Sequence, residues 1–147
     1  MEYHILAVGD VVMEPGLRHL ERHLRTLKKL KNIAFTVVNG ENAAGVGLTE
    51  EQAWRIYDAG ADVVTLGNHA FGKSQIGTLL DEAPWLLRPA NYPAAAPGRG
   101  LCVVDMGRVQ VGVINLMGTA FMESLRCPFE TLDTLLKTPD LPNLCIV

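Results

Sequence analysis

Residues 35–42 read F-T-V-V-N-G-E-N, a short apolar run that ends abruptly in polar residues. The run Phe35–Val38 contains aromatic and β-branched side chains, which predict a buried strand. The dipeptide Asn39-Gly40 is typical of a turn, so the strand is expected to end there. Glu41 and Asn42 therefore follow directly after the end of a predicted strand.

The same arrangement occurs on both sides of this run. Upstream, the apolar residues Ile5–Val8 are followed by Gly9 and Asp10, and downstream Val63–Leu66 is followed by Gly67, Asn68 and His69. Each apolar run is short and bounded by turn residues, as expected of strands buried on both faces. The sequence thus predicts three successive strands that each end in polar residues.

Helices are predicted between these strands. After Pro15, leucines recur at steps of three and four, which indicates an amphipathic helix with a basic, solvated face. Thr49 and Gln52 form a capping box for a helix that Gly60 ends, and a short helix is predicted over Ser74–Glu82. The alternation predicts an α/β fold class, a mostly parallel sheet with helices on both faces.

The alternation changes after residue 83. Prolines recur between residues 84 and 100, which predicts a rigid, irregular loop. The later elements expected are a hairpin of Leu101–Met106 and Val109–Asn115, a helix over Pro128–Leu136, and a strand over Asn143–Val147. Because a chain seldom finishes inside a buried strand, we expect residues 1–147 to form one domain that is incomplete at its C-terminus.

Composition excludes several classes of protein. The chain has 147 residues and a net charge of −3, which argues against a surface that binds polyanions, so no stable nucleic-acid complex is expected. Its apolar runs are too short to span a membrane. The three cysteines form no C-x-x-C motif and are expected to be buried or inert thiols. With no signal-peptide pattern, the expected localisation is cytoplasmic.

The polar residues at the strand ends predict a metal site. In a parallel sheet the carboxyl ends of the strands meet at one edge, and ligands bind outside that edge. Carboxylate and amide oxygens are ligands for hard and borderline divalent cations. Two such ions, about 3.5–4 Å apart, can clamp the attacking and leaving oxygens of a phosphoryl transfer, and a neighbouring histidine can protonate the leaving oxygen. The predicted members are Asp10, Glu41, Asn42, Asn68 and His69.

Residues 67–74 support a different hypothesis. They read G-N-H-A-F-G-K-S, which fits the phosphate-binding P-loop pattern and lies between a predicted strand and a predicted helix. A P-loop nucleotide-binding protein that uses Gly67–Ser74 is therefore one alternative function. It leaves Asp10, Glu41 and Asn42 unexplained. A second alternative is a fragment without catalytic activity.

Several segments together resemble the YmdB-like metallophosphoesterases of the calcineurin-like superfamily. The segments are G-D-V-V at 9–12, N-G-E-N-A-A-G at 39–45, T-L-G-N-H at 65–69, L-R-P-A-N-Y-P at 87–93, P-G-R-G at 97–100, V-I-N-L-M-G at 113–118 and C-P-F at 127–129. They occur in order along most of the chain. N-G-E-N-A-A and L-R-P-A-N-Y-P are the most specific.

The resemblance implies a metallophosphoesterase-type layered sandwich and the hydrolysis of a small phosphodiester, notably a 2′,3′-cyclic nucleotide. It implies two divalent metal ions, with iron or manganese favoured and magnesium or zinc also compatible. Asp10 matches the first metal ligand, Glu41 the carboxylate that bridges the ions, and Asn42 and Asn68 further ligands. His69 matches the proposed acid.

The family's remaining ligands are histidines in D-F-H-like and G-T-H-T-H-like segments, and this sequence contains neither segment. We therefore expect the 147-residue chain alone to bind at most one ion weakly and to be a poor enzyme. The apolar strand near Val147 would leave an exposed sheet edge, which favours self-association. A homo-oligomer is the expected state.

Overall fold

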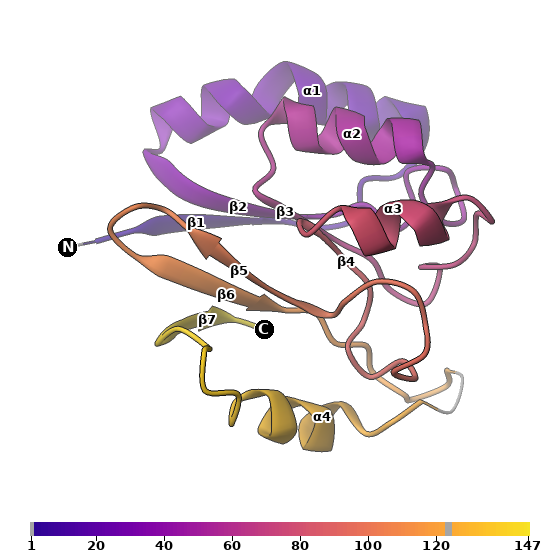
Figure 1. Ribbon diagram of the computed structural model, residues 1–147. Coiled ribbons are helices and arrows are strands. Elements are labelled where there is room, and N and C mark those ends of the chain that lie inside the picture. Colours follow the sequence, from indigo (N-terminus) through magenta and orange to yellow (C-terminus); the bar gives the residue numbers. More distant parts are fainter. Residues whose placement is uncertain (1, 123–124) are drawn as a thin grey trace.

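The structure is a computed structural model that describes residues 2–122 and 125–147. Two β-sheets pack face to face, and helices cover the outside (Figure 1). In chain order the elements are β1 (His4–Val8), α1 (Met13–Leu30), β2 (Ile33–Asn39), α2 (Glu50–Ala59), β3 (Val63–Thr65), α3 (Ile76–Glu82), β4 (Leu86–Leu87), β5 (Leu101–Asp105), β6 (Gln110–Ile114), α4 (Pro128–Leu135) and β7 (Leu144–Ile146).

The first sheet is parallel, with the order β1-β2-β3-β4. Its side chains alternate between two apolar clusters, as the period of two in a strand requires. Val64 and Leu86 pack in the cluster beneath the helices, whereas Val63 and Leu87 pack against the second sheet. Burial on both faces explains the near-continuous apolar sequence of β2, β3 and β4. Strand β1 lies at the sheet edge and is partly exposed, so the prediction that Ile5–Val8 is a buried strand is wrong.

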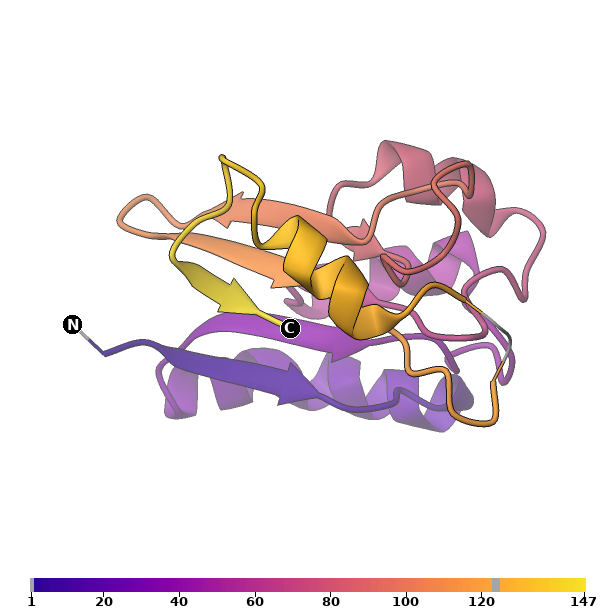
Figure 2. The same cartoon turned by 90° about the horizontal axis from the view of Figure 1, so that it is seen from below.

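The layers confirm the α/β class and the mostly parallel sheet. Helices α1, α2 and α3 lie on one face of the first sheet, the second sheet lies on the other face, and α4 lies outside the second sheet (Figures 1 and 2). Helices thus cover both outer faces of the sandwich. The inner face of the parallel sheet meets strands because Val111 and Val113 of β6 turn apolar side chains toward it.

The second sheet contains the predicted hairpin. Strands β5 and β6 pair antiparallel, and Gly107 in their turn has a φ of 81°, which glycine adopts without strain. Strand β7 pairs parallel with β6. Asn115, which follows β6, donates from Nδ2 to the carbonyl oxygens of Leu66 (2.7 Å) and Leu87 (3.0 Å). The two sheets are therefore joined near the ends of β3 and β4.

The helix boundaries follow local signals in one case and tertiary contacts in another. The capping box of Thr49 and Gln52 is present on α2, and Gly60 ends that helix with a φ of 117°. Helix α1 begins at Met13, so Pro15 lies in its first turn as predicted, and the backbone N–H of Met13 donates to the carbonyl of Asn42 at 3.0 Å. This bond joins the start of α1 to the loop after β2.

Part of the basic face of α1 contacts protein, although the sequence predicts a solvated face. Lys28 donates to the carbonyl of Gly60 at 2.7 Å and pairs with Asp62, and Arg25 donates to the carbonyl of Asp58. The last carbonyls of a helix lack partners within the helix, so cations are favoured there. These side chains fix the end of α2 against α1.

The proline-rich segment contains one strand that the sequence does not predict. Leu86–Leu87 forms β4 and pairs with β3. The buried side chain of Arg88 then donates to the carbonyls of Pro89, Ala96 and Pro97, which holds the following loop together. Over the described residues, no helix is both long enough and apolar enough to cross a membrane.

Candidate functional site

Three loops meet at the carboxyl edge of the parallel sheet. They follow β1, β2 and β3, and they carry Asp10, Glu41 with Asn42, and Asn68 with His69. Backbone hydrogen bonds join the loops, since the N–H of Val11 donates to the carbonyl of Asn39 at 2.9 Å and the N–H of Gly40 donates to that of Thr65 at 3.0 Å. The structure therefore places all the predicted site residues on one edge.

Asp10 lies between two asparagine side chains from the next loop. Its Oδ1 accepts a hydrogen bond from Nδ2 of Asn39 at 2.7 Å, and its Oδ2 accepts one from Nδ2 of Asn42 at 3.1 Å. Asp10 is exposed, so the carboxylate remains open to solvent on its outer side. These two bonds fix the orientation of a negatively charged oxygen pair.

His69 is oriented by Asn42. Because Nδ2 of Asn42 faces Asp10, its Oδ1 faces the imidazole, and Nδ1 of His69 lies 2.9 Å from that oxygen. An amide oxygen only accepts hydrogen bonds, so Nδ1 carries the proton. The nitrogen that can gain or lose a proton is then Nε2.

Glu41 packs against the backbone of Gly67. A Cβ atom on Gly67 would lie 2.3 Å from Oε2 of Glu41, which is far inside van der Waals contact. The same Oε2 accepts a long hydrogen bond from the backbone N–H of His69 at 3.4 Å. Only glycine leaves room for the carboxylate in this place.

Asn68 belongs to the same edge but has different contacts. Its backbone carbonyl accepts a hydrogen bond from the hydroxyl of Tyr92 at 3.5 Å. It also lines a pocket of about 250 Å³ together with Met117, Phe121 and Met122. Asp10, Glu41, Asn42 and His69 are thus joined by the hydrogen bonds given above, whereas Asn68 extends the edge toward that pocket.

Asn39 is a site residue that the sequence predicts only as part of a turn. Its Nδ2 donates to Asp10, and its Oδ1 accepts from the backbone N–H of Glu41 at 3.0 Å. One side chain therefore holds the carboxylate of Asp10 and the backbone of Glu41. The signal in the sequence is weak, because asparagine before glycine is common in turns for reasons of backbone conformation alone.

A model of the family described as YmdB-like protein matches residues 6–147. This chain belongs to the YmdB-like family. A relative from Bacillus subtilis (strain 168), named 2′,3′-cyclic-nucleotide 2′-phosphodiesterase, is 41% identical over 133 residues, and the match covers 90% of this chain and 50% of the relative. A relative from Mycoplasma genitalium, named putative phosphatase/phosphodiesterase MG246, is 28% identical over 144 residues, covering 92% and 51%.

Solved structures share the YmdB-like fold. A hypothetical protein from Thermus thermophilus superposes with a TM-score of 0.82 at 37% identity, covering 90% of this chain and 52% of that one. A structure described as a novel phosphatase, from Mycoplasma pneumoniae, superposes with a TM-score of 0.87 at 26% identity, covering 99% and 54%. The chain spans about half the length of the relatives it matches.

The loop at Gly67–Ser74 of this YmdB-like chain does not have P-loop geometry. A P-loop directs several backbone N–H groups at a phosphate. Here the N–H of Ala70 donates to the carbonyl of Gly67 at 3.1 Å, and that of Gly72 donates to the carbonyl of His69 at 2.9 Å. The N–H of His69 contacts Glu41. These amides are used within the loop and the site, which argues against the P-loop hypothesis.

The donors of the YmdB-like site fit a cation that prefers oxygen. The carboxylates of Asp10 and Glu41 lie on adjacent loops, together with the amide of Asn42. The carboxylate of Glu41 occupies the space that a Cβ atom on Gly67 would fill. Among residues 2–122 and 125–147, no three histidine, cysteine, aspartate or glutamate side chains form a metal-binding group. The donors described fit one ion better than two.

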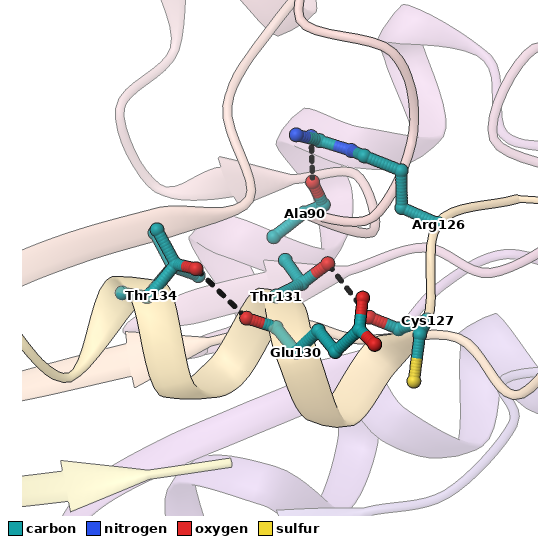
Figure 3. A pocket seen from close by; sticks show the side chains of 7 residues that line it. Ala90, Arg126, Cys127, Glu130, Thr131 and Thr134 are labelled. Atoms are coloured by element: carbon teal, nitrogen blue, oxygen red, sulfur yellow. Dashed lines mark hydrogen bonds between the residues drawn. The ribbon is translucent and has the colours of Figure 1, made fainter.

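A second pocket of the YmdB-like chain, about 290 Å³ in volume, lies beside α4 and shares no residue with this site (Figure 3). Its polar side chains serve the local backbone: Arg126 donates to the carbonyl of Ala90, and Thr131 to that of Cys127. Cys127 is exposed, so it is not one of the buried thiols that the sequence predicts. Cys102 fits that prediction, since burial raises the pKa of its thiol to about 11.

Proposed function

We propose that the complete protein is a metal-dependent phosphodiesterase that hydrolyses 2′,3′-cyclic nucleotides or related small phosphodiesters. One observation carries the proposal. Asp10, Asn42 and His69, from the loops after three different strands, form a continuous hydrogen-bonded chain at one sheet edge. The names of the relatives, a 2′,3′-cyclic-nucleotide 2′-phosphodiesterase and a putative phosphatase/phosphodiesterase, support the same class of reaction.

The proposed metal ligands are Asp10, Glu41, Asn42 and Asn68. In the complete protein, Asp10 and Glu41 would supply negative charge to two divalent ions, and Glu41, which packs against Gly67, is the proposed shared ligand. When bound, the ions lower the pKa of water and neutralise charge on the phosphodiester. The proposed ions are iron or manganese, with magnesium or zinc also compatible. The oxygen donors of this chain suit manganese or magnesium, and iron or zinc would need nitrogen donors as well.

His69 is the proposed general acid. Its Nδ1 donates to Oδ1 of Asn42, which leaves Nε2 to carry the second proton of the imidazolium. That proton passes to the leaving oxygen as the phosphorus–oxygen bond breaks, and a histidine in this role contributes about 10²–10⁴-fold to the rate. Asn42 keeps the ring in the orientation and tautomer that this transfer needs.

We also propose that the protein self-associates and acts in the cytoplasm. In β1, Ile5 is 38% exposed and Ala7 is exposed, although the strand is apolar and lies at the sheet edge. Apolar strands at sheet edges pair readily with other chains. Sedimentation equilibrium tests the self-association, and a monomer mass at all concentrations contradicts it.

Cell fractionation tests the proposed cytoplasmic location. Recovery of the protein outside the cytoplasm contradicts it.

The test is hydrolysis of adenosine 2′,3′-cyclic phosphate in the presence of manganese. We expect a form that carries the second half found in the relatives to turn over, and the 147-residue chain to be much slower. In the longer form, Glu41→Gln and His69→Ala are each expected to lower kcat by about 10²-fold or more. Equal rates for the two lengths would show that the donors of this chain are sufficient. Unchanged rates in both variants contradict the proposal.

A further inference from the structure

The pocket beside Asn68 has a composition that the metal site does not explain. It has a volume of about 250 Å³, and its walls are Asn68, Met117, Phe121 and Met122. None of these side chains is charged, so the pocket suits a neutral group and not a phosphate. Three of the four are apolar and either aromatic or thioether, which favours contact with a flat π-system.

The pocket is continuous with the proposed catalytic edge. Asn68 belongs to both, and the next residue, His69, is the proposed acid. On the other side of Asn68, its carbonyl contacts the hydroxyl of Tyr92, whose ring packs edge-on against Phe71 with centroids 5.4 Å apart. A molecule whose phosphodiester lies at the site would therefore extend its remaining part over these side chains.

One wall of the pocket is held rigidly by a buried polar residue. Asn91 is fully buried, and its Nδ2 donates to the carbonyl of Met117 at 2.8 Å while its Oδ1 accepts from the N–H of Met117 at 3.0 Å. Nδ2 also donates to the carbonyl of Arg126 at 3.1 Å. The position of Met117 is thus fixed by a satisfied network and does not depend on a ligand.

Phe121 is unusual for an aromatic residue. Its relative exposure is 108%, so its ring is fully in contact with solvent, and its backbone φ is 59°, in the left-handed region. Few non-glycine residues adopt that conformation, and such residues gather at binding and active sites. With this exposure, the ring is available to stack on a ligand.

We propose that this pocket binds the nucleobase of the substrate, an inference that rests on the proposed function. The base stacks on Phe121 and contacts the thioethers of Met117 and Met122, while the phosphodiester lies beside His69. Because only Asn68 offers hydrogen-bonding groups among the four lining side chains, the pocket accepts different bases. Purines, with the larger ring system, bind more tightly than pyrimidines.

The test uses 2-aminopurine riboside, a fluorescent nucleoside without phosphate, whose emission is quenched when its base stacks. Titration of the 147-residue chain is expected to give saturable quenching. Phe121→Ala is expected to weaken binding about tenfold, the range typical of one stacked base. Met122→Ala weakens it less. The matched control is Phe129→Ala, since Phe129 is 77% exposed on α4 and outside the pocket, and it should leave binding unchanged.

Competition identifies the part of the ligand that binds. Adenosine should displace the probe, and ribose 5-phosphate should not. The inference is overturned if quenching is absent, if Phe121→Ala and Phe129→Ala have the same effect, or if ribose 5-phosphate competes as well as adenosine. Because the probe has no phosphate, these results do not depend on hydrolysis. If the longer form does not hydrolyse adenosine 2′,3′-cyclic phosphate in the manganese assay, that result contradicts the proposed function and leaves the nucleobase pocket unaffected.

Discussion

At the scale of single residues, the site depends on a glycine as much as on its charged groups. The carboxylate of Glu41 occupies the space where a side chain on Gly67 would begin. Asn39 then fixes the backbone of Glu41 through its side-chain oxygen. A carboxylate held in this way is oriented before any cation binds. Residues that hold a metal ligand in place without touching the metal contribute to metal affinity in this way.

Gly67→Ala tests this arrangement without removing a ligand. The new Cβ would lie 2.3 Å from Oε2, so the carboxylate of Glu41 must move. We expect manganese affinity, measured by isothermal titration, to fall about 10–100-fold. Gly9→Ala is the matched control, because Gly9 lies in the loop after β1 and a Cβ there meets nothing within 4 Å. Equal losses in the two variants, or none in Gly67→Ala, contradict this view of Glu41.

Glu14 carries the clearest electrostatic signal outside the site. Arg55 donates to both of its oxygens at 3.0 Å, and Arg18 adds a further bond, which together lower the pKa of Glu14 to about 2. A lowered pKa in the folded chain means that the carboxylate stabilises the fold at pH values above its ordinary pKa. This contribution is lost as the pH falls from about 4.5 toward 2.

Glu14→Gln should therefore lower Tm at pH 7, and the difference from the parent should shrink as the pH falls through this range. Thermal unfolding followed by circular dichroism at pH 7, 5, 4 and 3 measures it. Asp133→Asn, at an exposed position of α4 beyond its first turn, is the control and should show little effect at any pH. A difference that is constant with pH would mean that the ion pairs of Glu14 contribute nothing.

At the scale of elements, local sequence determines α2 more completely than any other helix described. Thr49 accepts from the N–H of Gln52 at 3.3 Å, and the side chain of Gln52 accepts from the N–H of Thr49 at 3.2 Å. Thr49→Ala should destabilise the chain by about 1 kcal/mol. Urea unfolding measures the loss, with Thr78→Ala on the exposed face of α3 as the control. A loss no larger than that of the control contradicts the capping role.

The elements that the sequence predicts are those with strong local signals, and those it misses depend on distant partners. The apolar runs before Glu41 and Asn68 identify strands because a strand buried on both faces has no polar alternation. The run before Asp10 also forms a strand, although that strand lies at the sheet edge and is partly exposed. Strand β4 lies among prolines and is formed by hydrogen bonds with β3: the N–H of Val64 donates to the carbonyl of Trp85 at 2.8 Å. No local pattern of two residues can indicate such a pairing.

The candidate site shows the same division. Its carboxylates and His69 are predictable because they follow strands that must share an edge. The role of Asn39 is not predictable from the sequence. It depends on the hydrogen bond to Asp10, and only the folded sheet brings the loop of Asp10 next to Asn39. The pocket at Phe121 also depends on tertiary contacts, because Asn91 brings Met117 beside Asn68 from a separate part of the chain.

At the scale of the whole molecule, two sheets and three loops combine to build one edge. Asn115 joins the second sheet to the ends of β3 and β4, and Met13 joins α1 to the loop of Asn42. The site is therefore supported by elements on both sides of the sandwich. The described donors, with oxygens and one imidazole, predict a single cation bound weakly by this chain.

Titration of the 147-residue chain with manganese, followed by electron paramagnetic resonance of the free ion, tests this most directly. We predict one saturable site per chain, weakened at least tenfold in the double variant Asp10→Asn, Glu41→Gln. The control, Asp105→Asn with Glu130→Gln, changes two exposed acidic residues away from the edge and should bind as the parent does. If both double variants bind manganese as tightly as the parent, the strand-end residues do not form a metal site.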